Sequence, residues 1–289
     1  MESSPVRNRL LLAAAALLFS TGGAAIKAAT LTAWQVASFR SGVAALFLLA
    51  ALPEARRGWR WRIAPPAAAY AATLVLFVLA NRLTTSANAI FLQSTAPLYL
   101  LLLGPWLLRE PVRRSDLLVI AAVAVGMALI FLGSDPAAAS APDPRRGNLL
   151  GLGTGIAWAL TVTGLRWLGR AGEGNAATAT VAAGNVIGFA VALPMALPVA
   201  HASVASLAVI LYLGILQIGL AYAFVTRAIR HVPAFEATTV LLLEPALNPV
   251  WAWLAQGERP GARPLAGGAI ILTATLANTW RQARASRTA

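Results

Sequence analysis

The chain contains no cysteine among its 289 residues, and this absence excludes several kinds of site. Without a thiol there can be no disulfide, no thiolate ligand for a metal ion and no cysteine nucleophile. The two histidines, His201 and His231, have no companion ligands at a spacing typical of a metal site. We therefore expect no metal centre and no cofactor.

Charged residues are also scarce, and most of them have one sign. Only 11% of the residues are charged, with 10 acidic residues against 23 basic ones. The net charge of +13 does not indicate nucleic-acid binding, because the arginines lie between apolar runs and form no basic face interleaved with aromatic residues. We expect no nucleic-acid partner.

Apolar residues are abundant instead. They make up 58% of the chain, and the mean hydropathy is +0.71, which is more apolar surface than one water-soluble core can hide. A helix that crosses a bilayer needs about 20 apolar residues, so this length accommodates about ten spans with short loops. The sequence predicts an all-α integral membrane protein whose ten transmembrane helices cover residues 8–29, 34–52, 63–80, 85–108, 115–133, 147–168, 176–200, 203–228, 233–256 and 264–281.

One sequence pattern occurs in both halves of the chain. A proline is followed thirteen positions later by a glutamate, as Pro97 with Glu110 and again as Pro245 with Glu258. Because each half holds an odd number of predicted spans, the second half must enter the membrane from the opposite side. The sequence therefore predicts two inverted five-helix repeats, residues 1–133 and 147–289, joined by an outer linker at 134–146.

The basic residues indicate the orientation. With the N-terminus inside, sixteen of the 23 basic residues lie in inner loops and termini and five lie in outer loops. Such an excess is typical of the cytoplasmic side, so we expect a plasma (inner) membrane protein with both termini in the cytoplasm. Arg7 and Arg9 before an apolar run also resemble a cleavable signal peptide, but cleavage would remove the first helix of a repeat.

Glu244 is the most informative single residue. It lies about eleven residues into the span 233–256, which at about 1.5 Å per residue is about 16 Å deep. An isolated acid at that depth costs at least about 2.5 kcal/mol, so it must face water, find a partner or be protonated. Two roles follow: a coupling site for a proton or another cation, or a hydrogen-bonded acid that holds two helices together.

Pro97 and Pro245 occupy matching positions in spans four and nine. Proline lacks an amide hydrogen and clashes with the preceding turn, so we expect both helices to bend or open near the middle of the membrane. Helices broken at matching positions of two repeats are the best sequence indication of a substrate site. The alternative is a packing kink that binds no ligand.

Several polar and aromatic side chains are predicted at similar depth. Amides inside a bilayer can bind a polar substrate, but they more often bond a neighbouring helix. Aromatic side chains can form the apolar wall of a pocket, or pack in the core, or face lipid. The candidates for a substrate-binding or coupling site are Asn88, Gln93, Asn185, Gln217, Trp158 and Tyr222, in addition to Glu244.

Four further charged residues have two interpretations each. Arg40 and Lys27, in the outer halves of spans two and one, can attract an anionic group or extend to the membrane surface. Glu110 and Glu258 lie at the C-terminal ends of spans four and nine, where the helix dipole disfavours an acid. We expect them to pair with nearby arginines, such as Arg259, or to cap the next helix, with gating as the second interpretation.

Glycines recur every four residues in two spans, at Gly147, Gly151 and Gly155 and at Gly184 and Gly188. This spacing allows helices to approach closely, either within one chain or in a homodimer.

The order of these motifs resembles the EamA-type family of the drug/metabolite transporter superfamily. The resemblance rests on Phe19 with Lys27, the matching Trp158 with Arg166, the arginine at position 40, and the repeated Pro-x12-Glu pattern. It implies ten helices, inverted repeats, cytoplasmic termini and secondary transport of small metabolites, often export. The first half departs from the pattern by having Phe19 where the family commonly has tryptophan. It also has Ala96 where the second half has Glu244.

These observations predict a secondary active transporter that exports a small metabolite or drug-like organic molecule by alternating access, with the lipid bilayer as its surroundings. A channel or a structural membrane subunit is the alternative, because repeats and kinks do not by themselves require alternating access. A membrane enzyme has less support, since the chain contains neither an HExxH nor a GxSxG motif.

Overall fold

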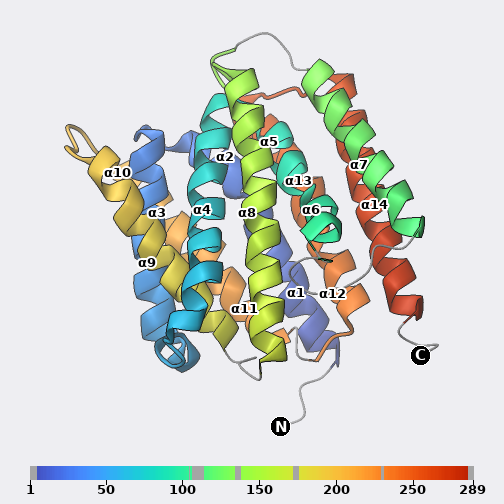
Figure 1. Cartoon of the computed structure of the whole chain (residues 1–289). Helices are drawn as coiled ribbons and strands as arrows, with labels where there is room; N and C mark the ends of the chain where they lie inside the picture. Colours follow the sequence, from blue (N-terminus) through green and yellow to red (C-terminus); the bar gives the residue numbers. More distant parts are fainter. Residues whose placement is uncertain are drawn as a thin grey trace.

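The computed structural model describes residues 5–103, 105, 114–133, 138–171, 176–228 and 231–285 (Figure 1). Across these residues the chain is helical apart from turns and one isolated bridge between Ala138 and Ala141. Before the linker the elements are α1 (Pro5–Ser20), α2 (Gly22–Ala28), α3 (Ala33–Ala51), the 3-10 turns η1 (Pro53–Arg56) and η2 (Trp61–Ile63), α4 (Ala64–Leu83), α5 (Ser86–Gln93), α6 (Ala96–Leu103) and α7 (Arg114–Leu132).

After the linker the chain forms α8 (Pro144–Arg170), α9 (Ala176–Ala196), α10 (Val204–Leu211), the π-helical segment η4 (Tyr212–Leu220), α11 (Ala221–Ala228), α12 (Ala234–Leu241), α13 (Leu243–Gln256) and α14 (Ala262–Ala285). The prediction of an all-helical fold is confirmed for the described residues.

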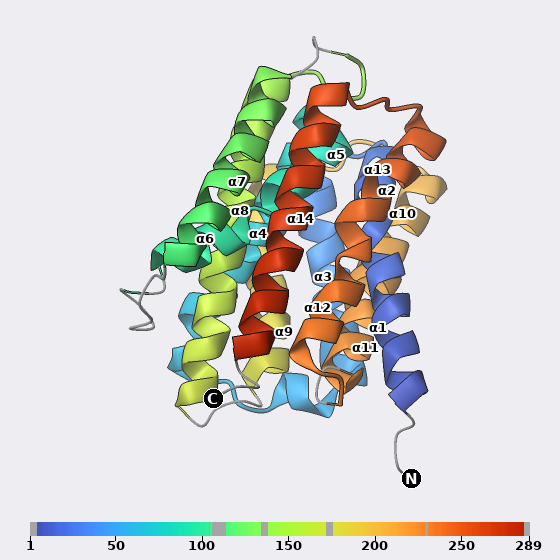
Figure 2. The same cartoon turned by 90° about the vertical axis from the view of Figure 1, so that its right-hand side faces the viewer.

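The helices stand side by side in one bundle (Figures 1 and 2). The most extensive contacts join α4 to α8, α3 to α9 and α7 to α14. Each of these pairs takes one helix from the first half of the chain and one from the second. The halves are therefore interleaved along the bundle and share one interior.

Helix α1 begins and α14 ends at one end of the bundle, and the segment from Ala138 to Asp143 lies at the other end (Figure 1). We call these the terminal end and the linker end.

Seven helical stretches of the described chain are long and apolar enough to cross a membrane. They are Val6–Ala28, Ala33–Ala51, Trp61–Leu83, Ser86–Leu103, Pro144–Arg170, Ala176–Ala196 and Val204–Ala228, and the apolar helix Asp116–Leu132 is shorter. The predicted spans 233–256 and 264–281 form helices but are not among the seven. An integral membrane protein is supported, and the count of ten spans stays a prediction.

Large apolar side chains lie on the outside of the bundle. Leu46, Leu118, Leu132 and Val204 are each more than 70% exposed, at 72, 75, 75 and 84%. So many apolar side chains facing outward are typical of a surface that contacts lipid.

Three of the predicted spans are interrupted helices. The helix breaks at Thr21 between α1 and α2, at Ser94 and Thr95 between α5 and α6, and at Leu242 between α12 and α13. Pro97 and Pro245 lie in the first turns of α6 and α13, where a missing amide hydrogen costs least. The two breaks thus occupy matching positions of the two halves.

The regularly spaced glycines pack inside the chain. A Cβ on Gly147, Gly151 or Gly155 of α8 would lie within 3.1 Å of atoms of the α4–α5 turn or of α5, and one on Gly184 would lie 2.6 Å from the ring of Tyr70. Gly188 likewise faces α3 and α4. These glycines bring helices of one chain together, which is the first of the two interpretations of their spacing.

Candidate functional site

Four aromatic side chains meet between the two halves. The ring centroid of Tyr70 on α4 lies 5.7 Å from that of Tyr222 on α11 and 6.3 Å from that of Trp158 on α8. Tyr222 also packs edge to face against Phe19 of α1, with centroids 5.2 Å apart. Tyr70 is buried and the other three rings are half-buried.

Glu244 lies beside this aromatic cluster. It occupies the second position of α13, two residues after the helix break at Leu242, and lies near the hydroxyl groups of Tyr70 and Tyr222. Glu244 is half-exposed, and no hydrogen bond or ion pair joins it to another described residue. An acid without a partner inside an apolar span is costly unless it meets water or a ligand or is protonated.

Arg40 and Asn185 approach the same tyrosine. Arg40 of α3 is 2% exposed, and its Nη2 donates to the carbonyl oxygen of Leu74 at 2.8 Å. Asn185 of α9 is fully buried, donates to the carbonyl oxygen of Val181 at 2.9 Å and lies close to the hydroxyl of Tyr70. Arg40 therefore does not extend to the membrane surface, because its guanidinium is held inside the bundle.

Gln217 supplies a further polar group near the aromatic cluster. It lies in η4, and its Nε2 donates to the carbonyl oxygen of Phe19 at 3.4 Å. Its Oε1 is buried and has no hydrogen-bond partner among the described residues. The side-chain amide of Gln217 therefore connects the π-helical segment to α1, and its Oε1 can still accept a hydrogen bond.

The break between α5 and α6 lies against α8. A Cβ on Gly155 would lie 2.7 Å from the carbonyl oxygen of Leu92 and 2.9 Å from Oγ1 of Thr95. Gly155 is three residues before Trp158, so the break and the aromatic cluster share one stretch of α8. Gln93 ends α5 and Pro97 opens α6, and both are half-buried.

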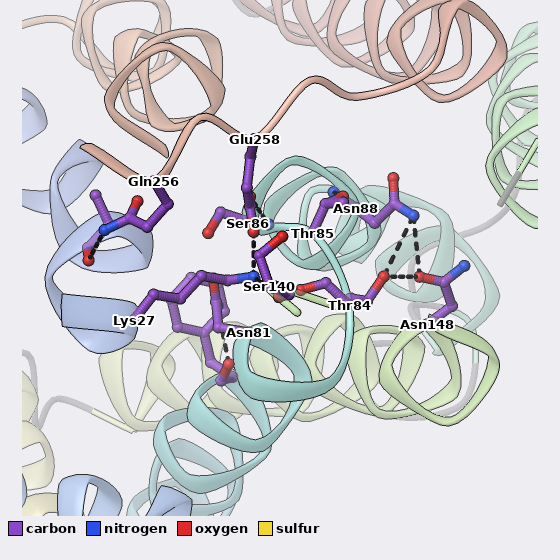
Figure 3. Close-up of polar contacts among 12 residues, drawn as sticks. Lys27, Asn81, Thr84, Thr85, Ser86, Asn88, Ser140, Asn148, Gln256 and Glu258 are labelled. Atoms are coloured by element: carbon purple, nitrogen blue, oxygen red, sulfur yellow. Dashed lines mark hydrogen bonds and ion pairs between the residues drawn. The ribbon is translucent and has the colours of Figure 1, made fainter. Parts of the chain in front are cut away.

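Asn88 lies elsewhere, in a polar network at the linker end (Figure 3). Its Nδ2 donates to Oγ1 of Thr84 at 3.3 Å and to Oδ1 of Asn148 at 3.2 Å, while Thr84 donates to Asn148 at 2.8 Å. All three side chains are buried. The network ties α5 and the end of α4 to α8, so the structure gives Asn88 a helix-joining role.

The linker end also contains a buried ion pair between Lys27 and Glu258 (Figure 3). The side chains of these residues are 5% and 1% exposed. Lys27 therefore does not extend to the membrane surface as an isolated cation, and Glu258 pairs with Lys27 and not with Arg259. The residue in the matching position of the first half, Glu110, lies outside the described residues.

A pocket of about 250 Å³ opens beside this ion pair. Its lining includes Thr84, Asn88, Ser140, Glu258 and Arg259, together with backbone of the turn between α13 and α14. The pocket belongs to the linker end and is separate from the aromatic cluster.

Asn248 is a candidate that the sequence analysis missed. It is fully buried on α13, one helical turn after Glu244, and neither polar atom of its side chain has a hydrogen-bond partner among the described residues. A Cβ on Gly23 would lie 2.8 Å from Oδ1 of Asn248 and 2.9 Å from Oγ of Ser86, so α2, α5 and α13 meet there. The spacing of four residues from Glu244 could have indicated a shared helix face.

Comparisons with known proteins agree with this architecture. The model of the EamA-like transporter family matches residues 8–132 and again residues 145–280. The chain is also similar to a protein of known crystal structure, with a TM-score of 0.59 and 18% identity over 94% of this chain and 96% of that one, a likeness that concerns the fold alone. No curated protein matches the chain.

Proposed function

This chain belongs to the EamA-like transporter family, and from that premise we propose that it is a secondary active exporter that moves a small metabolite or drug-like organic molecule by alternating access. The family consists of membrane transporters of the drug/metabolite superfamily, so the chain is an integral membrane transporter. The direction of transport, the class of solute and the mechanism are our proposal.

The observation that carries the proposal is the pair of helix breaks at matching positions of the two halves, one of which lies two residues before Glu244. A break leaves backbone groups without helical partners, and such groups are tolerated inside a membrane only where protein or water surrounds them. We place that wet region beside the second break, where Glu244 and three rings of the aromatic cluster are half-buried. Broken helices at related positions are a recurrent feature of transporter binding sites.

The proposed topology has ten spans in two inverted repeats of five. Both termini face the cytoplasm and the linker faces outward, in the plasma membrane. The excess of basic residues in the predicted inner loops supports this orientation. The start of α1 and the end of α14 lie at the opposite end of the bundle from the linker, which agrees with it (Figure 1).

In this proposal the solute binds against Tyr70, Trp158 and Tyr222, and Glu244 carries the coupling proton. An exporter driven by the inward proton gradient must move the solute and the proton in opposite directions, so Glu244 holds a proton only when the solute is absent. A solute that donates a hydrogen bond to the carboxylate favours its charged form, and protonation of Glu244 from the outer side releases the solute. Asn185 and Gln217 offer hydrogen-bond acceptors to the polar part of the solute.

The test uses proteoliposomes that contain the purified transporter and a pH-sensitive dye. A thermal-shift screen of amino-acid-like and amphipathic compounds first identifies a solute that binds, because a ligand of the folded protein raises its melting temperature. Adding that solute should then move protons through the native transporter and not through Glu244→Gln, which should still be stabilised by the solute. Passive equilibration of the solute without proton movement would indicate a channel and contradict the proposal.

A further inference from the structure

The ion pair between Lys27 and Glu258 joins segments that are 231 residues apart. Lys27 closes α2 in the first half of the chain, and Glu258 follows the left-handed Gly257 that ends α13 in the second half. Both side chains are almost completely buried.

Every hydrogen-bonding group of this pair is occupied. The ammonium of Lys27 donates to Glu258, to the carbonyl oxygen of Ser140 and, at 2.8 Å, to the carbonyl oxygen of Thr84. The second carboxylate oxygen of Glu258 accepts from the amide of Ser86 at 2.9 Å. Burying two charges is costly unless both are paired and hydrogen-bonded, and here both conditions hold.

The pair also matches the helix ends around it. Thr84 caps the C-terminus of α4, where the partial charge is negative, and Lys27 is bound there. Ser86 opens α5, where the partial charge is positive, and Glu258 is bound there. Each ionic group is therefore placed against the helix end of opposite sign.

The contacts of this pair connect four parts of the chain at the linker end. They are α2, the turn between α4 and α5, the linker at Ser140, and the turn between α13 and α14 (Figure 3). Separating the two halves at this end would require breaking the ion pair and hydrating both charges.

Two buried polar groups close to the ion pair have no hydrogen-bond partner among the described residues. They are the side chain of Asn248 and Oγ of Ser86. On α13, Glu244 and Asn248 share one helix face because they are four residues apart. Asn248 and Ser86 lie near each other beside Gly23, and the amide of Ser86 donates to Glu258, so buried polar groups occur between Glu244 and the ion pair.

We propose that Lys27 and Glu258 form a lock that closes the linker end of the solute path, so that this structure is the state closed at that end. The lock rests on the proposed function, because alternating access requires each end of the path to close in turn. When the linker end opens, the two charges separate, and Ser86 and Asn248 come into contact with water and solute.

The absence of cysteine allows a direct test. Ser86→Cys introduces the single thiol of the protein at a residue whose amide contacts Glu258. The hydroxyl that it replaces makes no hydrogen bond to a described residue. A membrane-impermeant thiol reagent should label it slowly in the otherwise native transporter. Lys27→Met or Glu258→Gln should raise the labelling rate about ten- to a hundredfold, because the population open at the linker end grows.

Two features of the result identify a lock. The double variant should label no faster than either single variant, since one interaction is lost in all three. Lys27→Arg should label nearly as slowly as the native residue because it keeps the charge. Melting temperature and gel-filtration profile of each variant verify that it is folded.

The matched control is Arg281→Gln. Arg281 of α14 donates to Asp116 of α7 at 2.5 Å, so it also joins the two halves by an ion pair, but it lies near the opposite end of α14. This variant should leave labelling at position 86 unchanged. Equal labelling in Lys27→Met and the native transporter would overturn the lock.

Transport measured in the same vesicles separates the two proposals. If the native protein transports solute but Lys27→Met does not change the labelling rate, the lock alone is contradicted. If Lys27→Met labels faster but the native protein transports nothing, the proposed function alone is contradicted.

Discussion

Gly126 on α7 and Gly267 on α14 face each other across the two halves with almost no space between their backbones. A Cβ on Gly126 would lie 2.7 Å from the carbonyl oxygen of Gly267, and a Cβ on Gly267 would lie 2.5 Å from the carbonyl oxygen of Gly126. The close approach is therefore reciprocal and involves backbone that cannot rotate away.

Alanine at either glycine should separate α7 from α14. We expect Gly126→Ala and Gly267→Ala each to destabilise the fold by about 1 to 3 kcal/mol, the usual cost of adding atoms to a full interface. A lower melting temperature in detergent would be the measurement. Gly169→Ala is the control, because nothing lies within 4 Å of the added methyl group, and it should have no such effect. Equal melting temperatures for all three variants would show that the contact between α7 and α14 is looser.

Trp158 should contribute to solute binding through its face toward Tyr70. Trp158→Ala is expected to weaken binding of a solute found by the thermal-shift screen about tenfold, since it removes a large aromatic wall. Trp253→Ala removes the same side chain from a position on α13 that is 51% exposed. If both substitutions weaken binding equally, the aromatic cluster is not the solute site.

Gly257 should be needed for the position of Glu258. Its φ of +67° is left-handed, so alanine there should cost about 1 to 2 kcal/mol, as should alanine at Gly58, whose φ is +79°. Only Gly257→Ala should also speed the labelling of Ser86→Cys, because only that turn holds the lock. Slow labelling in Gly257→Ala would mean that Glu258 keeps its place without the turn.

The buried network of Thr84, Asn88 and Asn148 should stabilise the packing of α8 against the turn between α4 and α5. Asn148→Ala removes the acceptor that the hydroxyl of Thr84 and Nδ2 of Asn88 share, which should destabilise the fold by about 1 to 3 kcal/mol. Thr154→Val is the comparison, since the hydroxyl of Thr154 bonds only the carbonyl oxygen of Leu150 in its own helix, at 2.9 Å. A larger drop in melting temperature for Thr154→Val would contradict the role of the network.

The proposed orientation can be tested with single cysteines in intact cells. Ala139→Cys in the linker and His201→Cys between α9 and α10 should react with an impermeant reagent from outside, whereas Trp59→Cys between α3 and α4 should not. All three residues are exposed, so differences in labelling report their side of the membrane. Labelling of position 59 from outside would reverse the topology.

The sequence alone determined the class of protein, the family resemblance and two of the regions where helices break, those next to Pro97 and Pro245. These follow from local properties: apolar runs of membrane-spanning length require helices, and a proline can interrupt only the helix that contains it. It also singled out Glu244, because an acid inside an apolar span is conspicuous wherever the chain folds.

Only the tertiary structure decided which distant groups meet. From the sequence, Glu258 could pair with the nearby Arg259 and Lys27 could extend to the membrane surface. That these two residues pair with each other depends on how α2 and α13 pack. Helix packing also decided that Tyr70 lies at the centre of the aromatic cluster and that Asn88 lies at the linker end. It decided as well that the glycines of α8 contact α4 and α5 of the same chain. A contact between two halves depends on the relative placement of whole helices, and local periodicity does not encode that placement.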